Sequence, residues 1–156
     1  MQNQINNAFA SLNAKILERQ TAWAMGRKAK VLDYRASDEY KTHRAMKWGS
    51  SITCQHEMDL CGGKGWYGII AHGSENGIKA AVAKNVEAMI ARRDAQIVKA
   101  LAKVGVTELP EFVLIETSDG MEGTFNVAGH VVTIRTILAG GYNVQCLHAR
   151  TLIKVR

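Results

Sequence analysis

Two closely spaced pairs of cysteine and histidine have side-chain types that bind metal ions. Cys54 and His56 are two residues apart, as are Cys146 and His148. Thiolate and imidazole groups are preferred ligands of zinc, and residues two apart in a strand point to the same side. Four such ligands would form a tetrahedral site if the two strands were neighbours. Because the spacings match no common zinc motif, we favour scattered, half-buried side chains and expect no metal or other cofactor.

A glycine-bearing turn at residues 71–78 precedes a predicted helix and could present free backbone N–H groups to an anion. Gly73 and Gly77 flank its polar centre. The turn lacks the lysine of a phosphate-binding loop and the glycine triplet of a dinucleotide fold. We therefore favour helix capping by Ser74 or Asn76, and keep a small enzyme or sensor of a phosphorylated ligand, bound at Gly73, Ser74 and Gly77, as an alternative.

Charge is unevenly distributed along this chain of 156 residues with net charge +6. Residues 19–48 carry eight basic side chains against three acidic ones, and residues 135–156 carry four basic side chains and no acidic one. Residues 104–134 hold five acidic side chains and no basic one. Dense basic surfaces attract polyanions, so the pattern favours a polyanionic partner. A solvated basic surface without a partner is the alternative.

Basic and aromatic residues together indicate where such a partner would bind. In the last predicted strand the odd positions from residue 147 are mostly apolar and the even positions are mostly basic, so one face of the strand would present a cationic row. Trp48 and Tyr142 would stack on bases or anchor a partner, and the cations would contact phosphates. The predicted set is Arg27, Lys28, Lys30, Arg35, Lys41, Arg44, Lys47, Trp48, Tyr142, His148, Arg150 and Lys154.

The leading functional hypothesis is a non-catalytic binding protein for nucleic acid or a host nucleoprotein complex. An inhibitor that binds a host defence or replication protein directly is an alternative, through the acidic run Glu108–Glu122 or exposed aromatic side chains. The five histidines have no nucleophile elbow or paired carboxylates around them, so the sequence supplies no catalytic constellation.

The element that organises the chain is a predicted helix over residues 74–104, whose apolar residues recur at steps of three, four or eight and which Gly105 is expected to close. Arg93 is the stripe position without an apolar side chain, so we expect a bend, an early end or an arginine that reaches past the core. A second helix is predicted over 4–25 with Gly26 as its stop, followed by a strand or extended link over 27–34. Its predicted apolar face consists of Ile5, Phe9, Leu12, Ile16 and Trp23. Ser37 is expected to cap a third helix over 38–48.

The remaining segments have strand composition, and short turns separate them. After the central helix the turns are predicted at 118–120, 128–129 and 140–141. Two strands are predicted before the central helix, at 52–58 and 66–71, and four after it, at 112–117, 123–127, 130–138 and 142–155. The expected fold is α+β, with a four-stranded C-terminal meander plus one or two earlier strands packed on the long central helix. It forms a single domain over 1–156, divided into a mainly helical 1–48, strands in 49–73, the helix 74–104 and the meander 112–156. The N-terminal helix could also pack on a second copy in a homodimer.

The composition is that of a globular protein, with 47% hydrophobic residues, 22% charged residues and one proline. No apolar run approaches the ~18 to 20 residues that span a bilayer, and residues 1–7 lack a secretory pattern. We therefore expect no membrane association. An odd number of cysteines without a disulfide-type spacing is typical of the cytoplasm.

The final stretch, ILAGGYNVQCLHARTLIKVR, covers residues 137–156. It resembles the C-termini of small uncharacterised proteins of bacteriophages and other mobile elements. The resemblance implies a short cytoplasmic accessory protein that acts during infection, where binding nucleic acid and blocking a host complex are common tasks. It implies no activity, and no functional residue is carried over from it.

Overall fold

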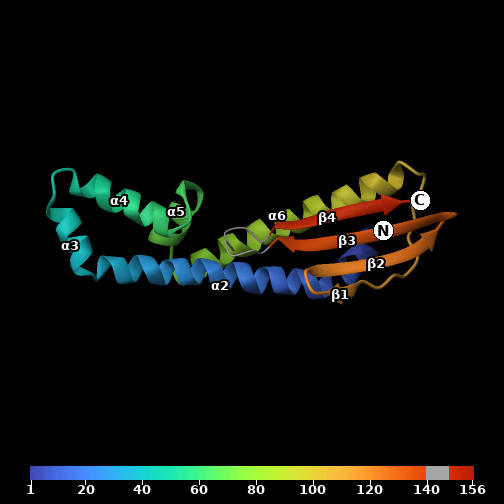
Figure 1. Ribbon diagram of the computed structural model, residues 1–156, viewed down its shortest axis with the longest axis horizontal. Coiled ribbons are helices and arrows are strands. Elements are labelled where there is room, and N and C mark those ends of the chain that lie inside the picture. The colour runs from blue at the N-terminus through green and yellow to red at the C-terminus, as the bar shows by residue number, and fades with distance from the viewer. Residues whose placement is uncertain (140–147) are drawn as a thin grey trace. The chain divides into compact units, whose positions relative to one another are not determined.

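The computed structural model describes residues 1–139 and 148–156, with side chains described for 1–137 and 150–156. It contains helices and an antiparallel sheet, so the predicted α+β class is confirmed (Figure 1). The chain divides into two compact units, unit 1 with residues 1–18 and 85–156 and unit 2 with residues 19–84. None of the described helices is both long enough and apolar enough to cross a membrane. The elements are α1 (Gln2–Ala8), α2 (Ala10–Arg35), α3 (Asp38–Ala45), α4 (Gly49–Leu60), α5 (Lys64–His72), α6 (Glu75–Ala102), β1 (Ile115–Thr117), β2 (Gly120–Val127), β3 (His130–Ala139) and β4 (His148–Val155).

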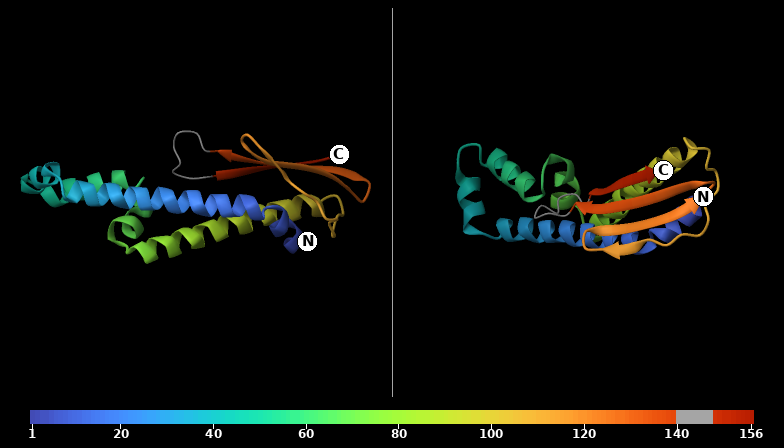
Figure 2. Two further views of the ribbon diagram at one scale, coloured as in Figure 1. Left: turned by 90° about the horizontal axis from the view of Figure 1, so that it is seen from below. Right: turned by 45° about the vertical axis from the view of Figure 1, so that its right-hand side comes forward.

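Unit 1 is a sheet packed on helices. The strands follow the order β1-β2-β3-β4, and every neighbouring pair is antiparallel, which confirms the predicted C-terminal meander. Helix α1 and the parts of α2 and α6 that belong to this unit lie on one face of the sheet (Figure 2). The side chain of Gln96 on α6 donates to the carbonyl of Thr151 on β4 at 3.3 Å, and Lys15 on α2 forms an ion pair with Glu116 on β1.

The turn between β2 and β3 is the two-residue connection predicted at Ala128 and Gly129. Both residues have positive φ, 49° and 78°, as the twist of a tight hairpin requires. The turn between β1 and β2 contains only Ser118 and Asp119, because β2 already begins at Gly120. A side chain at Gly120 would clash with the backbone of β3, so glycine is needed there. The turn predicted at residues 140–141 lies outside the described residues.

Most residues of the apolar faces predicted for the N-terminal and central helices are buried, while Trp23, Met89 and Val104 are half-buried. In the N-terminal face Ile5, Phe9, Leu12 and Ile16 are each at most 2% exposed. On α6 the buried stripe comprises Ile78, Val82, Val86, Ile97 and Leu101. Gly105 ends α6 as predicted, since its φ is 76° and the N–H of Val106 donates to the carbonyl of Leu101 at 3.1 Å.

Arg93 does not end α6, which continues to Ala102, and its side chain does not reach past the core. Its side chain is buried, donates to Asp94 at 2.9 and 3.1 Å and to Asn13 at 2.7 Å, and lies over the ring of Phe9 at 4.0 Å. Burial lowers the pKa of this guanidinium, and the neighbouring Asp94 carboxylate opposes that effect. The gap in the apolar stripe is therefore a buried ion pair of unit 1.

Unit 2 is entirely helical, which corrects the prediction of strands at 52–58 and 66–71. The first segment belongs to α4 and the second to α5. In α4 the buried residues Thr53 and Glu57 are four apart, which is helical spacing. In α5 the isoleucine and aromatic residues are typical of a strand, but Trp66 packs edge-on against Trp23 of α2, with ring centroids 5.6 Å apart. Tertiary packing thus outweighs local strand propensity in both segments.

The predicted helix stop at Gly26 is also wrong, as is the strand or extended link predicted over 27–34. Helix α2 continues to Arg35 because Val31 and Tyr34 prolong its buried face, at 0% and 5% exposed. A glycine inside a helix costs only about 1 kcal/mol, which this burial outweighs. The N-terminal helix instead breaks near Phe9, which separates α1 from α2.

Candidate functional site

A sharp corner joins α3 to α4 in unit 2. Ser37 caps α3 as predicted, because its hydroxyl accepts a hydrogen bond from the N–H of Tyr40 at 3.1 Å. The helix ends at Ala45, three residues earlier than predicted, and the chain turns within residues 46–48. A side chain at Gly49 would clash with the backbone carbonyl of Arg44, so only glycine fits the turn. The next helix therefore starts directly against the end of the previous one.

Trp48 lies in the turn of this corner and combines an unusual backbone conformation with an exposed side chain. Its backbone is in the left-handed region, with φ 65°, and its side chain is 73% exposed. A non-glycine residue in this conformation costs on the order of 1–3 kcal/mol, and an exposed tryptophan gains little burial in return. Such outliers are concentrated at functional sites. Trp48 is therefore the most unusual exposed side chain of unit 2.

Three exposed basic side chains lie on α3 or in the turn that contains Trp48. The ammonium of Lys47 lies 5.7 Å from the centroid of the Trp48 ring. Arg44 donates to the hydroxyl of Ser50 at 3.1 Å, which fixes its guanidinium beside the turn. Lys41 lies one turn earlier on α3, with Asp38 at 3.6 Å. We call Lys41, Arg44, Lys47 and Trp48 the corner patch.

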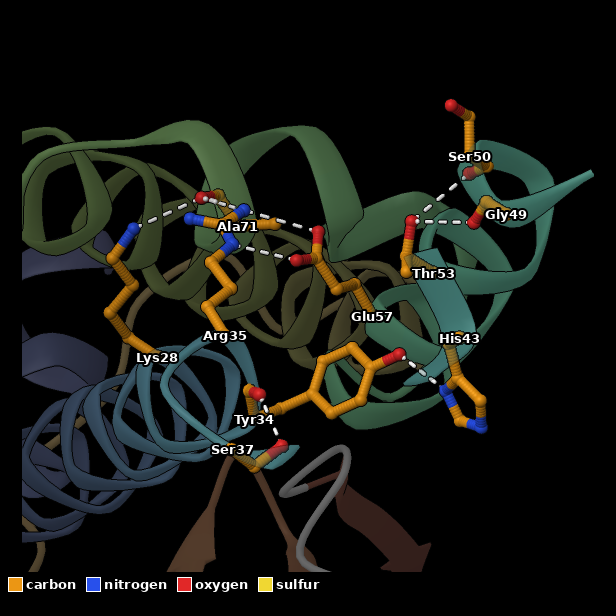
Figure 3. A network of polar contacts seen from close by, with 10 residues as sticks. All are labelled: Lys28, Tyr34, Arg35, Ser37, His43, Gly49, Ser50, Thr53, Glu57 and Ala71. Carbon is orange, nitrogen blue, oxygen red and sulfur yellow. Dashed lines mark hydrogen bonds and ion pairs between the residues drawn. The ribbon is translucent and has the colours of Figure 1, made fainter. Parts of the chain in front are cut away.

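An ion pair between a half-buried arginine and a buried glutamate joins α4 to α2 (Figure 3). Arg35 donates through Nε and Nη2 to the two carboxylate oxygens of Glu57, at 2.6 and 3.1 Å. The same Nη2 and the ammonium of Lys28 each donate to the carbonyl of Ala71 at the end of α5, both at 3.1 Å. The hydrogen bond with Glu57 raises the pKa of Arg35. Three helices are thereby tied together through charged side chains of α2.

Two histidines and two tyrosines cluster between α2, α3 and α4. The hydroxyl of Tyr34 and Nδ1 of His43 form a hydrogen bond of 2.7 Å (Figure 3). The His56 ring stacks on the Tyr34 ring with centroids 4.1 Å apart. The Tyr40 ring packs edge-on against the Tyr34 ring, with centroids 5.3 Å apart. Burial, followed by the carboxylates of Glu39 and Glu57, raises the pKa of Tyr34, so its hydroxyl remains protonated.

The described cysteines belong to the packing of unit 2. Cys54 forms a hydrogen bond with Tyr67 of α5, which is the largest of several effects that raise the pKa of that phenol to about 12. Cys61 is fully buried, and burial raises the pKa of its thiol, which makes it a poor nucleophile. Neither arrangement activates a cysteine for chemistry.

The structure separates the predicted basic residues into two groups. Three of them are half-buried and hydrogen-bonded within unit 2: Arg27 donates to the carbonyl of Leu60 at 3.4 Å, and Lys28 and Arg35 make the contacts described above. Exposed are Lys30, Lys41, Arg44, Lys47 and Trp48 in unit 2, and Arg150 and Lys154 on β4 of unit 1. On β4 the alternation is as expected, since Thr151 is buried between exposed neighbours. Tyr142 and Cys146 lie outside the described residues, and the side chain of His148 is not described.

The structure places helices at both predicted small-ligand sites. Cys54 and His56 lie on α4, where residues two apart point about 200° away from each other, so they do not form the strand-borne pair. The turn before α6 follows a helix instead of a strand, and the N–H of Gly77 donates to the Ser74 hydroxyl at 3.1 Å. Ser74, one of the two predicted capping residues, therefore caps α6.

One arrangement that the sequence analysis missed involves His56 and two residues of α3. Glu39, His43 and His56 each offer a ligand-type atom, and these three atoms lie within 4.8 Å of one another. The spacing of Glu39 and His43, one helical turn apart, was a signal available in the sequence. Their proximity to His56 depends on the corner and could not be predicted from spacing alone.

Comparison with protein-family models, curated proteins and solved structures finds no match for the chain.

Proposed function

We propose that the protein binds single-stranded nucleic acid through the corner patch, alone or within a host nucleoprotein complex. The observation that carries the proposal is Trp48, an exposed indole in a strained backbone conformation with Lys47 and Arg44 beside it. Bases stack on exposed aromatic rings, and neighbouring cations contact the phosphates of the same strand. The leading hypothesis from the sequence is retained with a smaller set of residues.

The remaining predicted cations have different places in this proposal. Arg27, Lys28 and Arg35 are committed to contacts inside unit 2, so we assign them to the support of the patch. Arg150 and Lys154 belong to unit 1 and would supply a separate phosphate-binding row on β4. Their contribution can be measured independently, because variants in one unit leave the residues of the other unchanged.

The test is binding of a fluorescently labelled single-stranded oligonucleotide, followed by anisotropy at increasing salt. Three phosphate contacts to a single strand predict a slope of log affinity against log salt of about −2. The double variant Arg44→Gln/Lys47→Gln is expected to reduce that slope to about −0.7. Trp48→Ala removes a stacking platform worth about 1–3 kcal/mol, so the dissociation constant should rise roughly 5- to 150-fold.

A matched control separates the corner patch from general charge. Lys79→Gln/Lys84→Gln removes the same charge from exposed positions of α6 in the same unit. This control is expected to bind nearly as well as the original protein. An equal loss of affinity in both double variants, or the absence of binding at low salt, refutes the proposal.

A second candidate is direct binding of a host protein at β1, and a specific observation favours it. Val113 and Ile115 are 80% and 70% exposed, and within the described part of the chain β1 is an edge strand that pairs with β2 alone. Unpaired strand edges with apolar side chains recruit extended segments of other chains. Val113, two residues before β1, also lines a cavity of about 460 Å³ between the N-terminal helices and residues 111–114. The test is capture of a partner protein from host lysate by the purified protein. The double variant Val113→Asp/Ile115→Asp should no longer capture the partner, whereas Leu152→Asp, which changes an exposed apolar residue on β4, should still capture it. Capture of the partner by the double variant refutes this candidate.

A further inference from the structure

The cluster of Glu39, His43 and His56 lies where α3 faces α4 in unit 2. It is the one group of three or more potential metal ligands among the described residues. Glu39 and His43 are one helical turn apart, so both point from the same face of α3. His56 comes from α4, on the other side of the corner. Two helices thus contribute ligand-type atoms to one point.

The distances are close to those of a coordination sphere. Oε1 of Glu39 and Nε2 of His43 are 3.9 Å apart, and all three ligand atoms lie within 4.8 Å of one another. Around a tetrahedral zinc ion with bonds of about 2.0–2.1 Å, neighbouring ligand atoms are roughly 3.4 Å apart. Glu39 is exposed, so its carboxylate can approach the two imidazoles by rotation of its side chain.

The outer contacts of the cluster support this use of His43. In the tautomer whose Nδ1–H donates to the hydroxyl oxygen of Tyr34, at 2.7 Å, Nε2 keeps a free lone pair and lies 3.9 Å from Oε1 of Glu39. A hydrogen bond at the second ring nitrogen is the usual means by which proteins orient a metal-binding histidine. Tyr34 is itself buried and stacks on the His56 ring, so a single tyrosine positions both imidazoles.

We propose that Glu39, His43 and His56 bind a divalent transition metal ion, with zinc as the physiological candidate. Two imidazoles and one carboxylate favour Zn²⁺, Co²⁺ or Ni²⁺ over the oxygen-coordinated Mg²⁺ and Ca²⁺. Three protein ligands leave a coordination position for water or for a group of a bound partner. The ion would join α3 to α4 and hold the corner at a defined angle. This inference is independent of nucleic-acid binding, because none of the three ligands belongs to the corner patch.

The test uses the full-length protein and Zn²⁺ alone, with binding followed by isothermal titration calorimetry. We expect one equivalent to bind and to raise the midpoint of thermal unfolding seen by tryptophan fluorescence, since Trp23, Trp48 and Trp66 all belong to unit 2. Glu39→Gln and His56→Phe should each weaken binding at least tenfold. Both variants preserve shape, and phenylalanine keeps the ring stacked on Tyr34. Tyr34→Phe should weaken binding 10- to 100-fold while leaving the three ligands in place.

Controls distinguish this site from other ligands in the chain. His130→Gln removes a histidine of unit 1 and should leave the affinity unchanged. Co²⁺ in place of Zn²⁺ should give the absorption of a nitrogen and oxygen site, without the intense charge-transfer band of a thiolate ligand. The proposal is overturned if no saturable binding occurs, if Glu39→Gln and His56→Phe both bind like the original protein, or if the cobalt spectrum shows a thiolate.

Discussion

Replacing Arg35 with methionine tests the buried ion pair that anchors α4 to α2. The change leaves the Glu57 carboxylate, whose side chain is 8% exposed, without its bidentate partner. Breaking a buried pair from one side costs about 3–5 kcal/mol, because the remaining charge stays desolvated. Since the Arg35 side chain is itself 32% exposed, solvent partly screens the pair. We therefore expect the lower end of that range, about 3 kcal/mol of lost unfolding free energy at pH 7.

The assay is equilibrium urea denaturation followed by tryptophan fluorescence. All three tryptophans of the chain lie in unit 2, so the signal reports the unit that contains the ion pair. The double variant Arg35→Met/Glu57→Met removes both charges and fills the space with apolar atoms. It should be more stable than Arg35→Met alone, because no unpaired carboxylate remains. The slope of free energy against urea should be the same in all variants if the unfolded state is unaffected.

Two results would show that this reasoning is wrong. One is a loss below about 1 kcal/mol in Arg35→Met, which would place the pair among exposed ion pairs of little net value. The other is additivity, in which the double variant loses as much as the sum of the two single variants. Additivity would mean that Arg35 and Glu57 do not interact energetically, whatever their distance.

Three further predictions concern other parts of the molecule. Arg93→Met leaves the buried Asp94 carboxylate without its cation and should cost about 3–5 kcal/mol, measured by the circular dichroism of urea unfolding. Tyr67 should ionise near pH 12 instead of 10.0. Its ionisation is measured as the tyrosinate absorbance that the wild-type protein shows and Tyr67→Phe lacks. Cys54→Ala should lower the pH at which Tyr67 ionises, because the hydrogen bond with Cys54 is lost. Because its folded-state pKa is raised, its contribution to stability is complete below pH 10 and is lost as the pH rises toward 12. Gly49→Ala should destabilise unit 2 by about 1–3 kcal/mol in fluorescence-detected urea unfolding, because its new methyl group meets a backbone carbonyl.

Elements with a long, regular pattern could be predicted from the sequence. The stripe of α6 and its glycine stop, the N-terminal apolar face and the capping serine at position 37 all follow from local rules. The C-terminal meander follows from short apolar segments separated by turn residues. In each case the residues that decide the structure are neighbours along the chain, so spacing is sufficient evidence.

Unit 2 could not be predicted in the same way, because its decisive contacts join residues far apart in sequence. Glu57 is buried because Arg35, 22 residues earlier, neutralises it, and without that partner the segment reads as a weak strand. Trp66 is helical because it packs on Trp23. The candidate sites follow the same division. The exposed cations of α3 were predictable from composition, whereas the meeting of His43 with His56 required knowledge of the corner.

The left-handed backbone of Trp48 means that stability and recognition make opposite demands on one position. Glycine or asparagine adopts this φ at lower cost, so a library selected for heat resistance should replace the tryptophan. A library selected for oligonucleotide capture should retain it. Sequencing the survivors of the two selections would therefore show at residue 48 whether the indole is kept in spite of its conformation.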